Sequence, residues 1–161
     1  MRLATERLEL RPLPAEAAAA LPDDRETASR LAGAALAPDW PAQELRDVLP
    51  RQTRAATFGI WVMIERETTT IVGDVGFHGP PDEAGTVEIG YSVVADRRRR
   101  GYATEAARAM VAWALAQPGV REVVAGCERT NDASIRTLER LGFVRTGEAG
   151  DELRWRYSPR A

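Results

Sequence analysis

The chain has 161 residues, of which 44% are hydrophobic and 29% charged, and its formal net charge is −2. This composition is typical of a folded globular protein, and the slight negative charge argues against a broad nucleic-acid-binding surface. No apolar stretch is long enough to cross a bilayer, and residues 1–6 lack the apolar region of a signal peptide. Because Cys127 is the only cysteine, no disulfide can form within the chain. We therefore expect one domain over residues 1–161 in the cytoplasm, with neither a membrane nor a nucleic acid as partner.

The first half of the chain predicts a short strand, three helices and two further strands. Leu8 and Leu10 alternate with charged residues, which is typical of a strand, and Pro12 ends it. The proline- and alanine-rich residues 32–41 and the glycine- and proline-rich residues 79–85 are expected to be loops. The predicted elements are a strand at 8–11, helices at 15–21, 25–31 and 42–54, and strands at 60–64 and 71–77.

Strands and helices alternate in the predicted second half. The helix that begins at Ala103 presents alanines at helical spacing, so it can lie close against a sheet. Asn131 is a suitable N-cap for a later helix, and Gly142 fits the residue that ends it. The expected strands are residues 86–94, 121–127, one that begins at 143, and 153–157, and the last two are expected to pair.

A turn of four arginines at residues 97–100 joins the strand at 86–94 to the following helix, and Gly101 lies at the junction. The first N–H groups of a helix are unpaired and carry the positive end of its dipole, which suits them to bind an anion. Gly101 lets the backbone approach a bulky ligand. An arginine guanidinium can donate two parallel hydrogen bonds to phosphate oxygens. The run alone would also fit a solvated surface or a nucleic-acid patch. Its acidic neighbours Asp96 and Glu105, and the lack of interleaved aromatic residues, argue against a nucleic-acid patch, which raises the weight of the pyrophosphate interpretation.

The segment Arg98-Arg99-Arg100-Gly101-Tyr102-Ala103 fits the pattern [Q/R]-x-x-G-x-[G/A] and resembles the acetyl-CoA pyrophosphate loop of the Gcn5-related N-acetyltransferases. Two further segments are similar to the branch of this family that contains the ribosomal-protein N-terminal acetyltransferases. They are residues 5–11, similar to its first strand, and 131–143, similar to its second coenzyme motif N-x-x-S-x-x-x-L-E-[K/R]-x-G-F. The resemblance implies an α/β (α+β) fold with a mixed, mostly antiparallel sheet and helices on both faces. Two adjacent parallel strands, here 86–94 and 121–127, would splay apart to admit the coenzyme.

The same resemblance implies the contacts to acetyl-CoA. The backbone N–H of Val93 or Val94 would hold the thioester carbonyl, and Asn131 would cap its helix, contact the pantetheine arm, or do both. The pyrophosphate would lie on the backbone of Arg98, Arg99, Arg100, Gly101, Tyr102, Ala103 and Thr104. No metal is expected, because His78 and Cys127 alone make a zinc cluster improbable.

Glu88 is the candidate general base. An amine attacks a thioester only after it has lost a proton, and amino groups are largely protonated at neutral pH. Strand alternation places Glu88 on the face opposite to that of Val87 and Ile89, where a carboxylate needs water or a cationic partner. On the residues alone, a catalytic base and a structural ion pair with an arginine are both open. Relatives place a glutamate here near the acceptor amine, which favours the base.

Ser134 is the candidate acid for the departing thiolate, which can also leave unaided. Many relatives carry a tyrosine seven residues after the motif asparagine, but that position is Leu138 in this chain. Ser134 lies in the first turn of the same helix and would substitute, although a serine there also caps backbone groups. Tyr91 and Tyr102 are interpreted as packing residues.

The resemblance thus implies an acetyl-CoA-dependent N-acetyltransferase that moves the acetyl group directly to a primary amine in a ternary complex. A protein N-terminus or a cationic small molecule is the predicted acceptor, because acids cluster in the segments that shape the acceptor side in relatives, although exposed acids also serve simply to keep a surface soluble. These acids are Asp23, Asp24, Glu26, Asp39, Glu148, Asp151 and Glu152. A non-catalytic acyl-CoA-binding regulatory module is the alternative function. The chain is expected to be a monomer or a homodimer.

Overall fold

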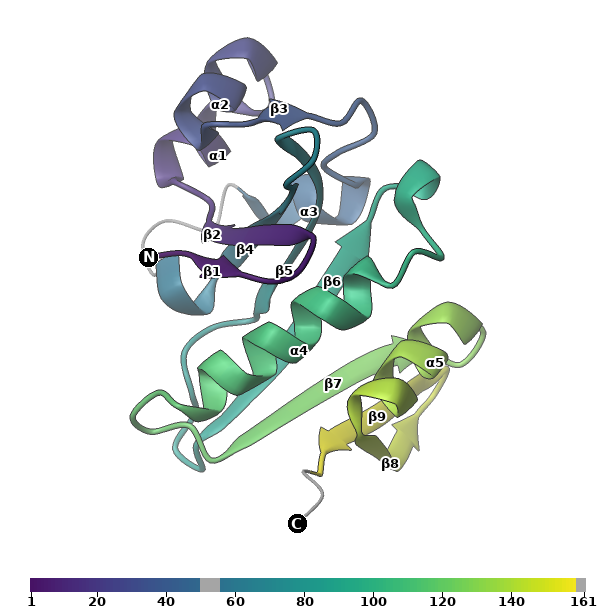
Figure 1. Cartoon of the computed structure of the whole chain (residues 1–161). Coiled ribbons are helices and arrows are strands. Elements are labelled where there is room, and N and C mark those ends of the chain that lie inside the picture. Colours follow the sequence, from purple (N-terminus) through teal and green to yellow (C-terminus); the bar gives the residue numbers. More distant parts are fainter. Residues whose placement is uncertain (50–55, 159–161) are drawn as a thin grey trace.

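The computed structural model describes residues 1–49 and 56–158 (Figure 1). Its strands are β1 (Leu3–Ala4), β2 (Leu8–Pro12), β3 (Ala35–Leu36), β4 (Ile60–Glu65), β5 (Thr70–Phe77), β6 (Thr86–Val93), β7 (Glu122–Glu128), β8 (Phe143–Ala149) and β9 (Glu152–Tyr157). Its helices are α1 (Ala15–Ala20), α2 (Arg25–Ala32), α3 (Gln43–Val48), α4 (Tyr102–Leu115) and α5 (Asp132–Leu141). A 3-10 turn at Ala56–Phe58 precedes β4, and another at Ala95–Arg97 follows β6.

The described strands form one sheet in the order β1-β2-β4-β5-β6-β7-β9-β8, and β3 pairs with β5 beside this path. Neighbouring strands are antiparallel except at β3–β5 and at the central pair β6–β7, which are parallel. Figure 1 shows α4 and α5 together in front of the sheet and α3 behind it. The predicted fold is therefore confirmed: a mixed, mostly antiparallel sheet with helices on both faces.

The central strands β6 and β7 separate toward their carboxyl ends. They pair only over residues 86–89 of β6 and 122–125 of β7. Beyond these residues β6 stays paired with β5 as far as Val93, while β7 stays paired with β9. The splayed parallel pair that the sequence predicts is thus confirmed, and the gap between the two strands opens after Ile89 and Ala125.

Two short strands were not predicted. β1 and β3 have two residues each, too few to show the alternation of side chains that marks a strand in a sequence. They form because a neighbour supplies backbone partners, as where the N–H of Ala37 donates to the carbonyl of Ile71 beside β3. The third predicted helix, at 42–54, is observed at Gln43–Val48, and residues 50–55 lie outside the described part of the chain.

α4 lies close to the sheet because its buried face is made mostly of alanine. Ala106, Ala107 and Ala114 are fully buried, with Met110 between them. Small side chains let the helix approach the strands, and the burial of Met110 supplies about 2–3 kcal/mol of hydrophobic stabilisation. The start of α4 is thereby fixed at the open end of the β6–β7 gap. Within the described residues, no helix has both the length and the apolar character needed to cross a bilayer.

Asp74 is a buried carboxylate near the middle of β5. Its Oδ2 atom accepts hydrogen bonds from Trp40 Nε1 at 2.9 Å and from Ser92 Oγ at 3.0 Å. Burial raises the pKa of Asp74 to about 6, although both hydrogen bonds favour the charged form. Because Ser92 alternates along β6 with Tyr91, which contacts α5, Asp74 and Trp40 lie on the face of the sheet away from α5.

The Asp74→Asn variant should alter the pH dependence of stability. A carboxyl group with a folded-state pKa of about 6 and an ordinary value of 3.8 binds more protons in the folded protein between these pH values. Its contribution to stability therefore falls as pH rises through this window, by about 3 kcal/mol in all. Asparagine keeps an oxygen acceptor but does not titrate, so the fall should be absent from the variant. Urea unfolding at about pH 4 and about pH 8 measures it, and an equal pH dependence in both proteins would contradict the assignment.

Candidate active site

Backbone N–H groups of β6 point into the gap between β6 and β7. The N–H of Val94 donates to the carbonyl of Val72, 2.9 Å away, so even-numbered residues of β6 and Val94 bond toward β5. The N–H groups of Tyr91 and Val93 point the other way, into the gap, where pairing with β7 has ended. Of the two predicted thioester contacts, Val93 is therefore the one whose backbone N–H has no partner in β5. The sequence prediction also named Val94 as a possible contact, and the structure corrects this, because the Val94 N–H is already bonded to the Val72 carbonyl.

The arginine turn contains two residues in the left-handed region and leads directly into α4. Arg99 has φ = 63° and Gly101 has φ = 83°. Gly101 is the N-cap of α4, and no side chain caps this helix end, so its first N–H groups are available to an anion. Arg98 Nε donates to the Val93 carbonyl at 2.9 Å, while the side chains of Arg99 and Arg100 are exposed. The residues predicted to hold pyrophosphate thus surround one helix N-terminus, with Ala103 and Thr104 in its first turn.

Glu65, at the end of β4, holds both flanks of this turn. The residue is 3% exposed, and its carboxylate accepts hydrogen bonds from Arg97 Nε at 2.9 Å, from the Tyr102 hydroxyl at 2.8 Å and from the Thr68 hydroxyl at 2.7 Å. Burial alone would raise the pKa of Glu65, but these bonds and the charge of Arg97 lower the pKa to about 2. The predicted coenzyme contact at Tyr102 is limited to its backbone, because its hydroxyl is bonded to Glu65 and its side chain is buried.

Glu65→Gln should destabilise the protein at neutral pH and leave it nearly unchanged in strong acid. The folded-state pKa of about 2 lies below the ordinary value of 4.5, so the contribution of Glu65 is present above about pH 4.5 and is lost as pH falls toward 2. We expect a loss of about 3 kcal/mol at pH 7. Thermal or urea unfolding of both proteins measures it, with the exposed Glu67→Gln as a matched control. A loss that is the same at all pH values would contradict this account of the carboxylate.

Arg7, between β1 and β2, holds the turn from the other side. Its guanidinium donates to the carbonyl of Arg100 at 2.7 Å and to Glu105 at 2.9 Å, and it lies 4.6 Å from the centre of the Tyr102 ring. Glu105 also accepts hydrogen bonds from the Thr5 hydroxyl at 2.5 Å and from the Arg7 N–H at 2.8 Å. Together, Glu65 and Arg7 fix the backbone that leads into α4, a role that the sequence did not predict for either residue.

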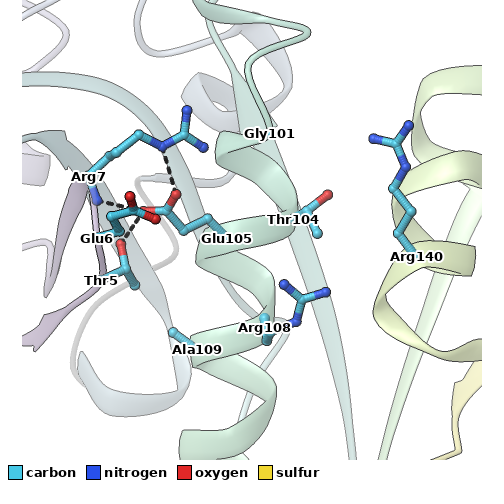
Figure 2. A pocket seen from close by; sticks show the side chains of 9 residues that line it. All are labelled: Thr5, Glu6, Arg7, Gly101, Thr104, Glu105, Arg108, Ala109 and Arg140. Carbon is cyan, nitrogen blue, oxygen red and sulfur yellow. Dashed lines mark hydrogen bonds and ion pairs between the residues drawn. The ribbon is translucent and has the colours of Figure 1, made fainter.

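A pocket of about 460 Å³ borders the turn (Figure 2). Its lining residues are Thr5, Glu6, Arg7, Gly101, Thr104, Glu105, Arg108, Ala109 and Arg140. Figure 2 shows Thr104 of α4 pointing toward Arg140 of α5, with Arg108 one turn further along α4. Arg108 and Arg140 are both exposed, and the ion pair with Arg7 balances the charge of Glu105. The part of the pocket between α4 and α5 is therefore suited to an anionic group.

Glu88 lies in a small ion-pair cluster. Its Oε1 atom is 3.1 Å from Arg154 Nη2, and its Oε2 atom is 3.1 Å from His78 Nδ1. Arg154 forms a second ion pair with Glu152. The structural interpretation that the sequence left open, an ion pair with an arginine, is therefore observed. The Glu88 side chain is 29% exposed, so an amine or a water molecule can still reach it.

Ser134 faces β6 from the first turn of α5. Its Oγ atom lies 3.1 Å from the hydroxyl of Tyr91, which is a partner that the sequence interpretation of Tyr91 as a packing residue missed. Asn131 Oδ1 accepts a hydrogen bond from the N–H of Ser134 at 3.0 Å, so Asn131 caps α5 as expected. The amide NH2 group of Asn131 is left for another contact. Leu138, where many relatives carry a tyrosine, is fully buried.

Comparison with known proteins identifies the family. Residues 7–144 match the model of the acetyltransferase (GNAT) domain. The chain is 34% identical over 126 residues to the uncharacterized N-acetyltransferase YjdG of Bacillus subtilis (strain 168), a match that covers 74% of this chain and 75% of that protein. An acetyltransferase structure from Agrobacterium tumefaciens str. C58 is 26% identical with a TM-score of 0.70, covering 99% of this chain and 95% of that one.

A ribosomal-protein-S5-alanine acetyltransferase from Vibrio fischeri shares the fold, with a TM-score of 0.68 and 16% identity over 97% of this chain and 95% of that one. The resemblance that the three sequence segments carried is confirmed by these matches, which reach well beyond the segments themselves. The chain belongs to the GNAT family and is an acetyltransferase.

Proposed function

We propose that this enzyme transfers the acetyl group of acetyl-CoA directly to a primary amine in a ternary complex, as a single domain in the cytoplasm. The observation that carries the proposal is the position of the uncapped N-terminus of α4 at the open end of the β6–β7 gap. One end of the gap can bind a pyrophosphate, and the gap itself offers the backbone N–H of Val93 to a carbonyl oxygen. An extended ligand with an anionic middle and a thioester end fits this arrangement.

The coenzyme would be bound by the backbone of the arginine turn and the first turn of α4. The residues are Arg98, Arg99, Arg100, Gly101, Tyr102, Ala103 and Thr104, with the Asn131 amide on the pantetheine arm. Arg108 and Arg140 border the adjoining pocket and would receive further phosphate oxygens of the nucleotide end. No metal takes part in the proposed reaction.

Three residues of the chain would have separate roles in the reaction. When bound, acetyl-CoA supplies an activated acyl group. The N–H of Val93 would donate to the thioester oxygen, on which negative charge develops. Glu88 would accept the proton of the amine, directly or through a water molecule, and Ser134 would donate a hydrogen bond to the departing sulfur.

For the acceptor we propose a cationic amine, either a protein N-terminus or a small molecule. Among the acids on which the sequence argument rested, Asp24 caps α2, and Glu148 and Glu152 are paired with arginines. These pairs reduce the negative charge that the late segment can offer to a ligand. The exposed carboxylates of Asp23, Glu26 and Asp39 are therefore the charges that we expect to attract a cationic amine.

A transfer assay tests this function. Release of free thiol from acetyl-CoA is followed while N-terminal peptides, polyamines and amino sugars are offered in turn, and mass spectrometry identifies the acetylated product. The 161 residues contain no lysine, so acetylation of a lysine side chain of the enzyme itself cannot be mistaken for transfer to the acceptor. We expect thiol and acetylated amine in equal amounts with at least one acceptor class. Tight binding of acetyl-CoA without transfer to any class would favour the non-catalytic acyl-CoA-binding module instead.

A further inference from the structure

The hydrogen bond between Tyr91 and Ser134 crosses the mouth of the gap between β6 and β7. Tyr91 lies on β6 two residues beyond the last pair with β7, and Ser134 lies in the first turn of α5, so the two hydroxyls meet 3.1 Å apart where the strands have separated. Both side chains are partly buried. The N–H of Val93, which points into the same gap, belongs to the next inward-facing residue of β6.

The environment of each hydroxyl determines which one donates. A serine or threonine in a helix commonly donates to a backbone carbonyl one turn earlier, and Thr137 of α5 does so, with Ala133 as acceptor at 3.0 Å. Ser134 instead has its described side-chain contact with Tyr91. Burial raises the pKa of the Tyr91 phenol, partly offset by the bond to Ser134, so the phenol stays protonated near neutral pH. A phenol is a stronger donor than an alkyl hydroxyl, which favours donation from Tyr91 to Ser134 Oγ.

We propose that Tyr91 is a positioning residue for the leaving group: its hydroxyl donates to Ser134 Oγ and thereby directs the proton of Ser134 at the sulfur of CoA. This inference rests on the proposed acetyl transfer. As the new C–N bond forms and the C–S bond breaks, the sulfur leaves with the electron pair, and the proton of the amine goes to Glu88 or water. The two hydroxyls keep their protons and stabilise the thiolate through a chain of two hydrogen bonds, each of which strengthens the other. Solvent protonates the thiolate after release.

Leu138 cannot take this role. Its side chain is fully buried in the core, so the position that carries a tyrosine in many relatives has no polar group in this chain. The phenol that acts on the leaving group comes here from β6, and it reaches the sulfur through Ser134.

Tyr91→Phe removes one oxygen atom and keeps the ring, so it tests the role directly. We expect kcat to fall by roughly 10-fold in Tyr91→Phe and in Ser134→Ala, with the KM for acetyl-CoA within about 2-fold of the wild type. The double variant should be no slower than the slower single variant, because both changes break the same chain of hydrogen bonds. Tyr157→Phe, on β9 and in contact with Phe143, is the matched control and should behave as the wild type.

A binding measurement separates this role from general damage. Ionisation of the thiol of bound CoA is followed by its ultraviolet absorbance, as the difference between enzyme with and without CoA. In the wild type, bound thiol should ionise at a pH about one unit below that of free CoA, and this shift should shrink in Tyr91→Phe and in Ser134→Ala. If Tyr91→Phe does not fold, the thiol titration of CoA bound to Ser134→Ala tests the same chain of hydrogen bonds.

Two results would overturn the inference. One is an unchanged thiol titration in both variants, and the other is a double variant whose loss equals the product of the two single losses. A wild-type enzyme that fails to bind CoA at all would instead contradict the proposed function, so the two failures are distinguishable.

Discussion

Gly101→Glu should weaken binding of acetyl-CoA by roughly two orders of magnitude or more. Gly101 has φ = 83°, and a Cβ atom there would lie 3.3 Å from Arg7 Nη2, so any side chain strains the turn and pushes against the residue that holds it. The left-handed conformation costs a non-glycine residue about 1–2 kcal/mol. The added carboxylate also places a negative charge beside the proposed pyrophosphate site. Isothermal titration calorimetry with acetyl-CoA measures the loss.

Two further variants separate the causes. Gly101→Ala introduces the strain without the charge and should weaken binding by roughly 10-fold. Gly150→Glu, where φ is 61° and a Cβ atom would meet nothing within 4 Å, introduces the same charge and the same kind of backbone strain in the β8–β9 turn. It should bind acetyl-CoA as the wild type does. Equal affinities in the wild type and Gly101→Glu would remove this turn from the coenzyme site.

Glu88→Gln should lower turnover near neutral pH by about 100-fold and leave the affinity for acetyl-CoA nearly unchanged. Glutamine can still bond Arg154 or His78, but it cannot accept the proton of the amine. Turnover should recover as pH rises, because a larger fraction of the amine is then already neutral. The measurement is kcat against pH with the acceptor found in the transfer assay.

A second carboxylate on the neighbouring strand provides the control for that experiment. Glu122 of β7 lies 3.6 Å from Arg156 and accepts a hydrogen bond from Thr86, so Glu122→Gln also disrupts an ion pair on the sheet. It should reduce stability slightly and leave the pH profile of kcat unchanged. If Glu88→Gln behaved in the same way, Glu88 would be a structural ion-pair partner of Arg154, and water would be the base.

The features that the sequence predicted are those that local patterns encode. The turn into α4 was recognisable because a strand, four arginines, a glycine and an alanine-rich segment follow one another within a short stretch of sequence. Asn131 was predicted as a cap because a cap acts within a few residues of its position. The splayed strands were predicted through the family resemblance, because strand separation has no local pattern of its own.

The features that were missed depend on contacts between distant segments. Glu65 and Arg97 are 32 positions apart, and Arg7 and Glu105 are 98 positions apart, so no periodicity could show that they meet at one turn. Tyr91 was interpreted as a packing residue, and its hydrogen-bond partner Ser134 lies 43 positions away in the sequence. The bonded N–H of Val94 was likewise invisible, because the register of β5 against β6 determines which N–H groups face the gap.

A titration of the wild type with acetyl-CoA tests whether the coenzyme binds at the open end of the β6–β7 gap. A ligand that binds only the folded protein raises the thermal midpoint, by an amount that grows with the logarithm of its concentration above Kd. We expect such a rise, one molecule bound per chain in calorimetry, and loss of both in Gly101→Glu but not in Gly150→Glu. A wild-type protein with no shift and no heat of binding at millimolar acetyl-CoA would contradict binding at this site.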